Sequence, residues 1–142
     1  MSDVESVREI LRTLAEVRDG PFYSLWVELT YRIKHPLPQI GFRIFQVADS
    51  AEAILGVGVS ATRPDGAEIG WSVGLETAPG SLVVSASVDL SDDKGNQEVF
   101  VRRADTQSCA EASKLIRKYA SEVCAELGPI KDKRNNEDQI MK

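Results

Sequence analysis

The chain has 142 residues with a formal net charge of -5, and 42% of its residues are hydrophobic and 27% charged. This length and composition suit one folded domain and exclude an intrinsically disordered chain. The excess of acidic residues argues against binding to phosphate backbones, which requires clustered Lys and Arg. The longest apolar runs have strand length and the chain starts with an acidic amphipathic segment, so we expect a cytoplasmic protein without a membrane partner.

The N-terminal segment has the spacing of an amphipathic helix over residues 3 to 18. Gly20 and Pro21 follow, a pair that commonly ends a helix, so we expect the helix to stop there. Ser2 or Asp3 can cap its free amides. The apolar side chains that recur every three or four residues are Val4, Val7, Ile10, Leu11, Leu14 and Val17.

Residues 25 to 33 alternate without a break, which is the period of a half-buried strand. We predict a first strand here, joined by the rigid segment 35–38 with its two prolines to an antiparallel neighbour over 40–47. Four more strands are predicted over 54–62, 68–77, 82–90 and 97–103, separated by short turns rich in Pro, Gly and Asp. Short connections exclude parallel pairs, so the sequence predicts a six-stranded antiparallel meander.

A second long helix is predicted from about Cys109 to Leu127, with Ser108 and Glu111 at the spacing of a capping box. Its apolar stripe is long enough to cross the sheet. The two cysteines of the chain, Cys109 and Cys124, lie about 22 Å apart along this helix at ~1.5 Å per residue and cannot form a disulfide. We expect both to be small buried residues.

These elements predict an α+β fold: an N-terminal helix, a curved six-stranded antiparallel meander and a long C-terminal helix packed on one face of the sheet. We expect one domain over residues 1–130. The segment 131–142 is charged and almost without apolar residues, so we expect it to be a flexible tail.

The predicted strands have two very different faces. Along each strand, every second residue is bulky and apolar, and the residues between them are small. Glycine weakens strands, so a group of glycines indicates either strong curvature of the sheet or close approach by another chain or ligand. The two interpretations are compatible, since a curved sheet makes a concave surface. The small residues are Gly56, Gly58, Ser60, Gly70, Ser72, Gly74, Ser85 and Ser87.

Three motif matches lack the context that their chemistry needs. Residues 70–74 fit the G-x-S-x-G nucleophile elbow, but no helix follows and the only histidine, His35, precedes Ser72. Residues 56–61 fit a loose dinucleotide fingerprint, but a turn follows in place of a helix. The acidic residues around Gly95 resemble a calcium loop, but Lys94 occupies its glycine position. We therefore expect strands and a hairpin turn here, and no metal or cofactor.

We expect a small non-enzymatic binding protein that acts through a protein–protein interface, as immunity proteins, antitoxins and secretion chaperones do. The acidic charge favours a basic protein partner. A homodimer is the alternative that the sequence also allows. Nucleic acid is not expected as a partner. The predicted partner-binding residues are Trp26, Arg32, Arg43, Phe45, Gly58, Ser60, Ser72 and Ser85, the first four as a border of the small-residue face.

The alternative is a small-molecule carrier. A curved antiparallel sheet closed by a long C-terminal helix loosely resembles the helix-grip architecture of lipid-binding domains, which implies a cavity between helix and sheet. Such a cavity would need small residues on the interior face of the sheet. In this chain the small residues lie on the opposite face, and the interior face is bulky. An esterase acting through Ser72 is a more distant hypothesis.

Overall fold

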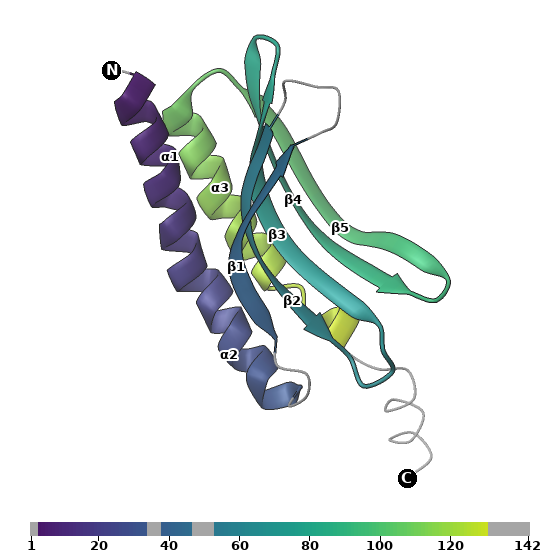
Figure 1. Ribbon diagram of the computed structural model, residues 1–142. Coiled ribbons are helices and arrows are strands. Elements are labelled where there is room, and N and C mark those ends of the chain that lie inside the picture. Colours follow the sequence, from purple (N-terminus) through teal and green to yellow (C-terminus); the bar gives the residue numbers. More distant parts are fainter. Residues whose placement is uncertain (1–2, 34–37, 47–52, 131–142) are drawn as a thin grey trace.

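The computed structural model describes residues 3–33, 38–46 and 53–130, with the side chains of 42–46 and 53–54 outside the description. The chain begins with a helical segment, continues through a sheet and ends with a helix (Figure 1). The elements are α1 Asp3–Val17, a π-helical turn Arg18–Phe22, α2 Tyr23–Arg32, β1 Gln39–Gln46, β2 Ala53–Thr62, β3 Glu68–Ala78, β4 Ser81–Asp92, β5 Gly95–Thr106, α3 Cys109–Cys124 and a 3-10 turn Gly128–Ile130.

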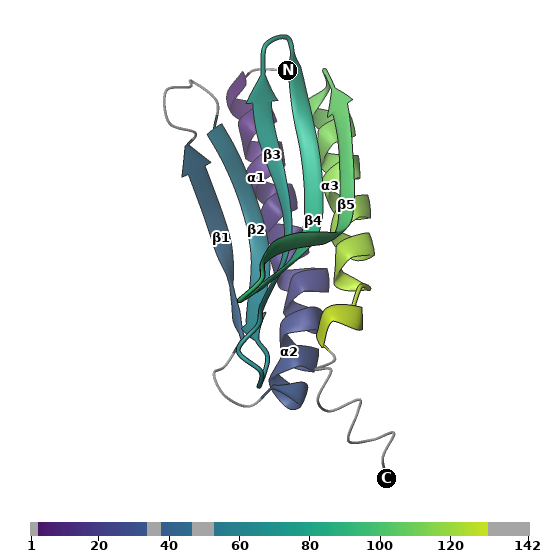
Figure 2. The ribbon, with the colours of Figure 1, turned by 90° about the vertical axis from the view of Figure 1, so that its right-hand side faces the viewer.

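The sheet has five strands in the order β1-β2-β3-β4-β5, and every neighbouring pair is antiparallel. The helices lie behind the sheet when it is viewed as in Figure 2, and no described helix covers its front. The fold is therefore a two-layer α+β arrangement with one covered and one open sheet face. The meander and its antiparallel pairing are confirmed.

The predicted strand over residues 25–33 is wrong, because this stretch forms α2. Leu25, Leu29 and Ile33 fit an alternating pattern, but they also recur every fourth residue. Leu25 and Leu29 are buried on the helix, and Ile33 is buried at its C-cap. An ion pair of 2.8 Å between Arg32 and Glu28 spans one helical turn. The sheet has five strands instead of six for this reason.

α1 ends at Val17, within one residue of the predicted limit at 18, but the prediction that Gly20 and Pro21 stop the helical segment is wrong. The chain widens into a single π-helical turn that contains Pro21 and then continues directly into α2. Wider turns of this kind are inserted within longer helices, and here the turn accommodates a proline. Phe22, at the end of the turn, is fully buried and anchors the junction in the core.

The five remaining strands begin and end within three residues of their predicted limits. The C-terminal helix starts at Cys109 as predicted, and the Ser108 side chain accepts a hydrogen bond of 3.2 Å from the Glu111 amide. It ends at Cys124, earlier than the predicted Leu127. The tail over 131–142 lies outside the described residues.

The core lies between the helices and the covered face of the sheet. Trp71 of β3 is fully buried at its centre, and its indole Nε1 donates a hydrogen bond of 2.8 Å to the carbonyl oxygen of Glu126. Buried indoles need such a partner, so this bond ties the sheet to the segment that follows α3. No described helix is long and apolar enough to span a membrane.

Candidate functional site

The two faces of the sheet differ sharply in side-chain size. Val57, Val73 and Ala86 pair across β2, β3 and β4 and are at most 2% exposed beneath the helices. The residues between them face the opposite, open side, because side chains alternate along a strand. We call this set the Gly/Ser floor: Gly56, Gly58, Ser60, Gly70, Ser72, Gly74, Ser85 and Ser87.

The strand register places several predicted partner-binding residues together on the floor. Gly58 pairs with Ser72, and Ser60 pairs with Gly70 on the same two strands. Ser85 of β4 pairs with Gly74 of β3. Thus Gly58, Ser60, Ser72 and Ser85 share one surface.

Trp26 and Arg32 do not border this floor, because both belong to α2. The Trp26 side chain packs against the core and donates a hydrogen bond of 2.8 Å to the carbonyl oxygen of Pro38. Its ring centroid lies 5.8 Å from that of Tyr23. Arg32 forms its ion pair with Glu28. The expectation that these two residues flank the sheet surface is therefore wrong.

Arg43 and Phe45 lie in β1, where Arg43 pairs with Gly56 and Phe45 with Ile54 of β2. Their side chains are outside the part of the chain that the structure describes. His35 is outside it as well.

The reason for glycine differs between positions of the floor. A Cβ added to Gly56 would lie 2.8 Å from the carbonyl oxygen of Val73, and one added to Gly58 would lie 2.5 Å from that of Trp71. Side chains do not fit at such distances, so β2 and β3 approach closely only because these two residues are glycine. A Cβ at Gly70 would meet no atom of the described residues within 4 Å. Packing therefore explains Gly56 and Gly58 but not Gly70.

The sheet curves so that the floor is concave. The pairing of β4 with β5 shifts between Val88 and Asp89: Val88 faces Phe100 and Asp89 faces Glu98, which leaves Val99 as an extra residue in β5. Such a bulge bends and twists a hairpin. Beyond it, the end of the β4–β5 hairpin curves away from the helices, and in Figure 2 it crosses in front of the sheet.

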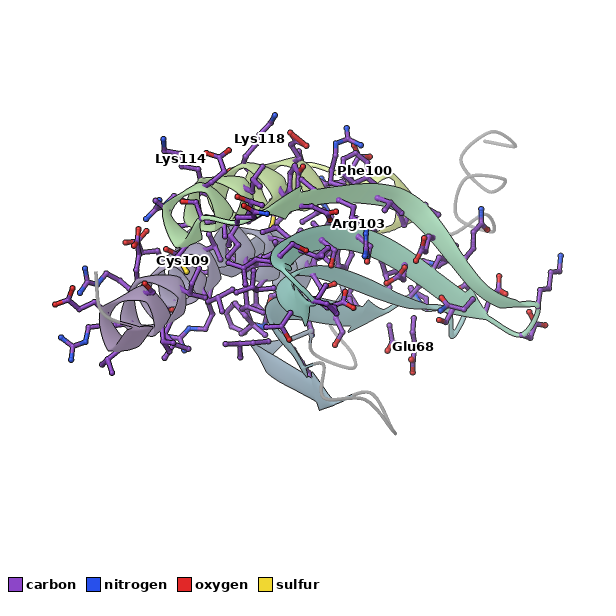
Figure 3. The ribbon with its side chains drawn as sticks, turned by 90° about the horizontal axis from the view of Figure 1, so that it is seen from above. Glu68, Phe100, Arg103, Cys109, Lys114 and Lys118 are labelled. Atoms are coloured by element: carbon purple, nitrogen blue, oxygen red, sulfur yellow. The ribbon has the colours of Figure 1, made fainter. Side chains whose placement is uncertain are left out.

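A hollow of about 220 Å³ lies in this concavity. Ser72, Ser85 and Ser87 contribute to its floor, and β5 supplies one wall through Glu98, Val101 and Arg103. Figure 3 shows Arg103 on the floor side of β5 and Phe100 on the side of α3. The hollow thus combines hydroxyl groups, a carboxylate, a guanidinium and an apolar side chain that is 44% exposed, Val101.

One end of the floor is closed by charged residues. The guanidinium of Arg103 lies 3.8 Å from the carboxylate of Glu76, although β4 runs between their strands. Val83 of β4 pairs with Glu76 on one side and Asp105 on the other, and it is only 3% exposed although it shares their face. This end of the floor therefore combines a buried apolar side chain with the charged groups of Glu76 and Arg103.

The motif matches occupy the structures expected for them. Residues 70–74 lie inside β3 and residues 56–61 inside β2, so neither ends in a helix N-terminus. The segment around Gly95 is the turn of the β4–β5 hairpin, and the Lys94 amide donates to the Asp92 carboxylate at 2.8 Å. Among the described residues, no group of three or more His, Cys, Asp or Glu side chains is placed to hold a metal ion.

The cysteines lie at the two ends of α3, and both are free and half-buried. Burial raises the pKa of the Cys124 thiol to about 12. This thiol is therefore protonated at neutral pH and is a poor nucleophile.

Sequence reasoning missed the wall that β5 provides. Counted back from Asp92 and Gly95, an unbroken hairpin would place Arg102 opposite Ser85, but the bulge shifts the register so that Arg103 pairs with Ser85 and Val101 with Ser87. Bulges have no reliable signature in a single sequence. Comparisons with protein-family models, curated proteins and solved structures found no match to this chain.

Proposed function

We propose that this chain is a non-enzymatic binding protein that acts through a protein–protein interface on the Gly/Ser floor. The observation that carries the proposal is an open, concave sheet face whose residue Gly70 has free space above it and no packing reason to be glycine. Small side chains allow the backbone or helix of another protein to approach the sheet closely. Close packing of β2 against β3 accounts for Gly56 and Gly58 but leaves Gly70 and the serines unexplained.

The edge of the floor has the chemistry of an interface. Val101 is 44% exposed, and the Arg103 side chain is 59% exposed and forms a long ion pair of 3.8 Å with Glu76. Arginine and exposed apolar residues are common where proteins meet, while the serines supply hydroxyl groups for hydrogen bonds.

The charge of the chain favours a basic partner. A net charge of -5 would steer a positively charged protein toward the complex, and added salt would weaken this effect. A role like that of an immunity protein, an antitoxin or a chaperone fits these properties. The free thiols of Cys109 and Cys124 suit a reducing compartment such as the cytoplasm.

The second candidate is a small-molecule carrier, which the hollow of about 220 Å³ favours. This volume is below the roughly 300–1,000 Å³ of drug-sized ligand sites. The hollow also lies on the open face, whereas a helix-grip cavity would lie between α3 and the sheet. We rank the carrier second for these two reasons.

A photo-crosslinking amino acid tests the first proposal against the second. It is placed at Ser72 on the floor or at Lys114, an exposed residue of α3 on the helix side (Figure 3), and each variant is expressed in the source cells. We expect one protein to be cross-linked from residue 72 and not from residue 114. Cross-linking from residue 114 alone would contradict the proposal, as would a small molecule that co-purifies with the chain and no cross-linked protein.

A further inference from the structure

Two carboxylates lie side by side on the open face of the sheet, next to Gly70. The register places Gly70 of β3, Asp89 of β4 and Glu98 of β5 in one row across the three strands. Asp89 shares the face of the Gly/Ser floor, because the Ser87 hydroxyl donates a hydrogen bond of 3.1 Å to its carboxylate. Ser87 and Glu98 both line the hollow. We call Gly70, Asp89 and Glu98 the acidic row.

The two carboxylates of the acidic row form no ion pair with any residue in the described part of the chain. Residues directly opposite each other on neighbouring strands have Cβ atoms about 4.5–5.5 Å apart, and like charges in this position destabilise a sheet. Arrangements that are unfavourable for the fold are typical of functional sites. A cation between Asp89 and Glu98 would remove the repulsion.

Gly70 leaves room for the group that carries such a cation. A Cβ at this position would meet no atom of the described residues within 4 Å. The apolar stem of a lysine or arginine can lie along a surface of this kind while its charged end reaches a polar group. The open position over Gly70 and the carboxylates beside it therefore match the two parts of one basic side chain.

The charge of the whole floor face has the same sign as the acidic row. Alternation along the strands places five acidic residues on this face but only one basic residue among the described side chains, Arg103, which is already paired with Glu76. Arg43 of β1 pairs with Gly56, and counting it as well leaves the acidic residues in excess. The adjoining hairpin turn holds two acidic residues and one basic residue, so it does not reverse the sign. The five acidic residues are Glu68, Glu76, Asp89, Glu98 and Asp105.

A second copy of the chain is disfavoured as the occupant of this surface. Two floors packed face to face about a two-fold axis would place the same acidic excess on both sides, and like charges across an interface oppose association. Contact between the floor and a different surface of a second copy would continue into rings or filaments. A segment of another protein with an exposed lysine or arginine has the complementary charge.

We infer that the acidic row receives a lysine or arginine side chain of the partner protein, with its stem over Gly70 and its charged end between Asp89 and Glu98. This inference rests on the proposed function, because it names the chemistry of the segment that the Gly/Ser floor binds. It also gives Gly70 a reason, since a larger residue would place its own side chain where that of the partner lies.

A displayed library of random peptides, selected on the full chain, tests the inference before any partner is identified. We expect the wild-type protein to enrich peptides that contain Lys or Arg and that no longer bind Ser72→Arg. Asp89→Asn and Glu98→Gln keep the size of each side chain and remove its charge, and each should weaken the selected peptides about tenfold. Asp93→Asn makes the same change in net charge in the hairpin turn and should leave their affinity unchanged.

The outcomes separate this inference from the proposed function. Peptides that depend on Ser72 but show no preference for Lys or Arg would overturn the inference and leave the floor as an interface. The same conclusion would follow if Asp89→Asn and Glu98→Gln bound these peptides like wild type, or if Asp93→Asn weakened them equally. Failure to select any peptide that depends on Ser72 would contradict both proposals.

The stability of the free chain gives a second measurement that needs no ligand. Glu98→Gln removes the like-charge contact with Asp89, so we expect its urea midpoint to rise above that of wild type at low salt. Added salt should reduce this difference, because it screens exposed charges. Asp93→Asn should show no comparable rise. A lower midpoint for Glu98→Gln would mean that Glu98 supports the fold, and would overturn the inference.

Discussion

Gly58 lies against the backbone of Trp71 so closely that a Cβ on residue 58 would be 2.5 Å from the Trp71 carbonyl oxygen. The neighbouring position in space, Gly70, has no such restriction, because no atom of the described residues lies within 4 Å of its Cβ position. Gly58 therefore allows β2 and β3 to pack closely, whereas Gly70 leaves the surface smooth.

Alanine substitutions distinguish the two glycines. Gly58→Ala forces β2 and β3 apart and should lower the free energy of unfolding by about 1–3 kcal/mol, which is typical of overpacking. Gly70→Ala should change it by less than about 0.5 kcal/mol, as expected for surface substitutions. Urea unfolding measures both. Equal destabilisation by the two substitutions would mean that Gly70, like Gly58, is required for the packing of the sheet, and would contradict this distinction.

The two tryptophans allow a matched test of the core. Trp71→Phe removes the hydrogen bond to the Glu126 carbonyl oxygen in a fully buried setting and should cost about 1–3 kcal/mol of unfolding free energy. Trp26→Phe removes a bond of the same 2.8 Å length to Pro38 on a half-buried side chain and should cost less. Thermal unfolding gives the order, and a larger loss at Trp26 would contradict the assignment of Trp71 as the centre of the core.

The buried thiol of Cys124 predicts a pH dependence. Its pKa in the folded chain is about 12, against an ordinary value of 9.0, so the unfolded chain ionises first as pH rises. The stability that the neutral thiol contributes is complete below pH 9.0 and is lost as pH rises toward about 12. A Cys109→Ala variant leaves Cys124 as the only thiol. In the folded variant, thiolate absorbance should rise only near pH 12, whereas in the unfolded variant it should rise near pH 9.0. Titration of the folded variant near the ordinary pKa would contradict this account.

The parts of the fold that were predictable are those in which one periodicity dominates. β2, β3 and β4 have strict alternation between turn signals, and their register follows from it. Residues 25–33 satisfy both a strand and a helix pattern, and the choice depends on the buried Phe22 and the continuous helix before it. No local signal shows that Pro21 lies within a π-helical turn. Tertiary context decides such cases.

The Gly/Ser floor was predictable from the alternation of residues along β2, β3 and β4, but the residues that border it were not. A strand over residues 25–33 would place Trp26 and Arg32 beside the floor, whereas α2 keeps both away from it. Arg103 and Val101 were not assigned to it, because their positions depend on how β5 pairs around its bulge. The residues on one face of a regular strand can be predicted from the sequence. Those that a bulged neighbouring strand contributes can be assigned only from the three-dimensional structure.

The most direct test of the floor as an interface is the affinity of Ser72→Arg for the protein cross-linked from residue 72, compared with wild type and with Lys114→Glu as a control on the helix side. The bulky charge lies over the hollow, so we predict that binding is lost in Ser72→Arg, unchanged in Lys114→Glu, and that both variants unfold at the wild-type urea concentration. Wild-type affinity of a folded Ser72→Arg protein would contradict the proposal that the Gly/Ser floor binds the partner.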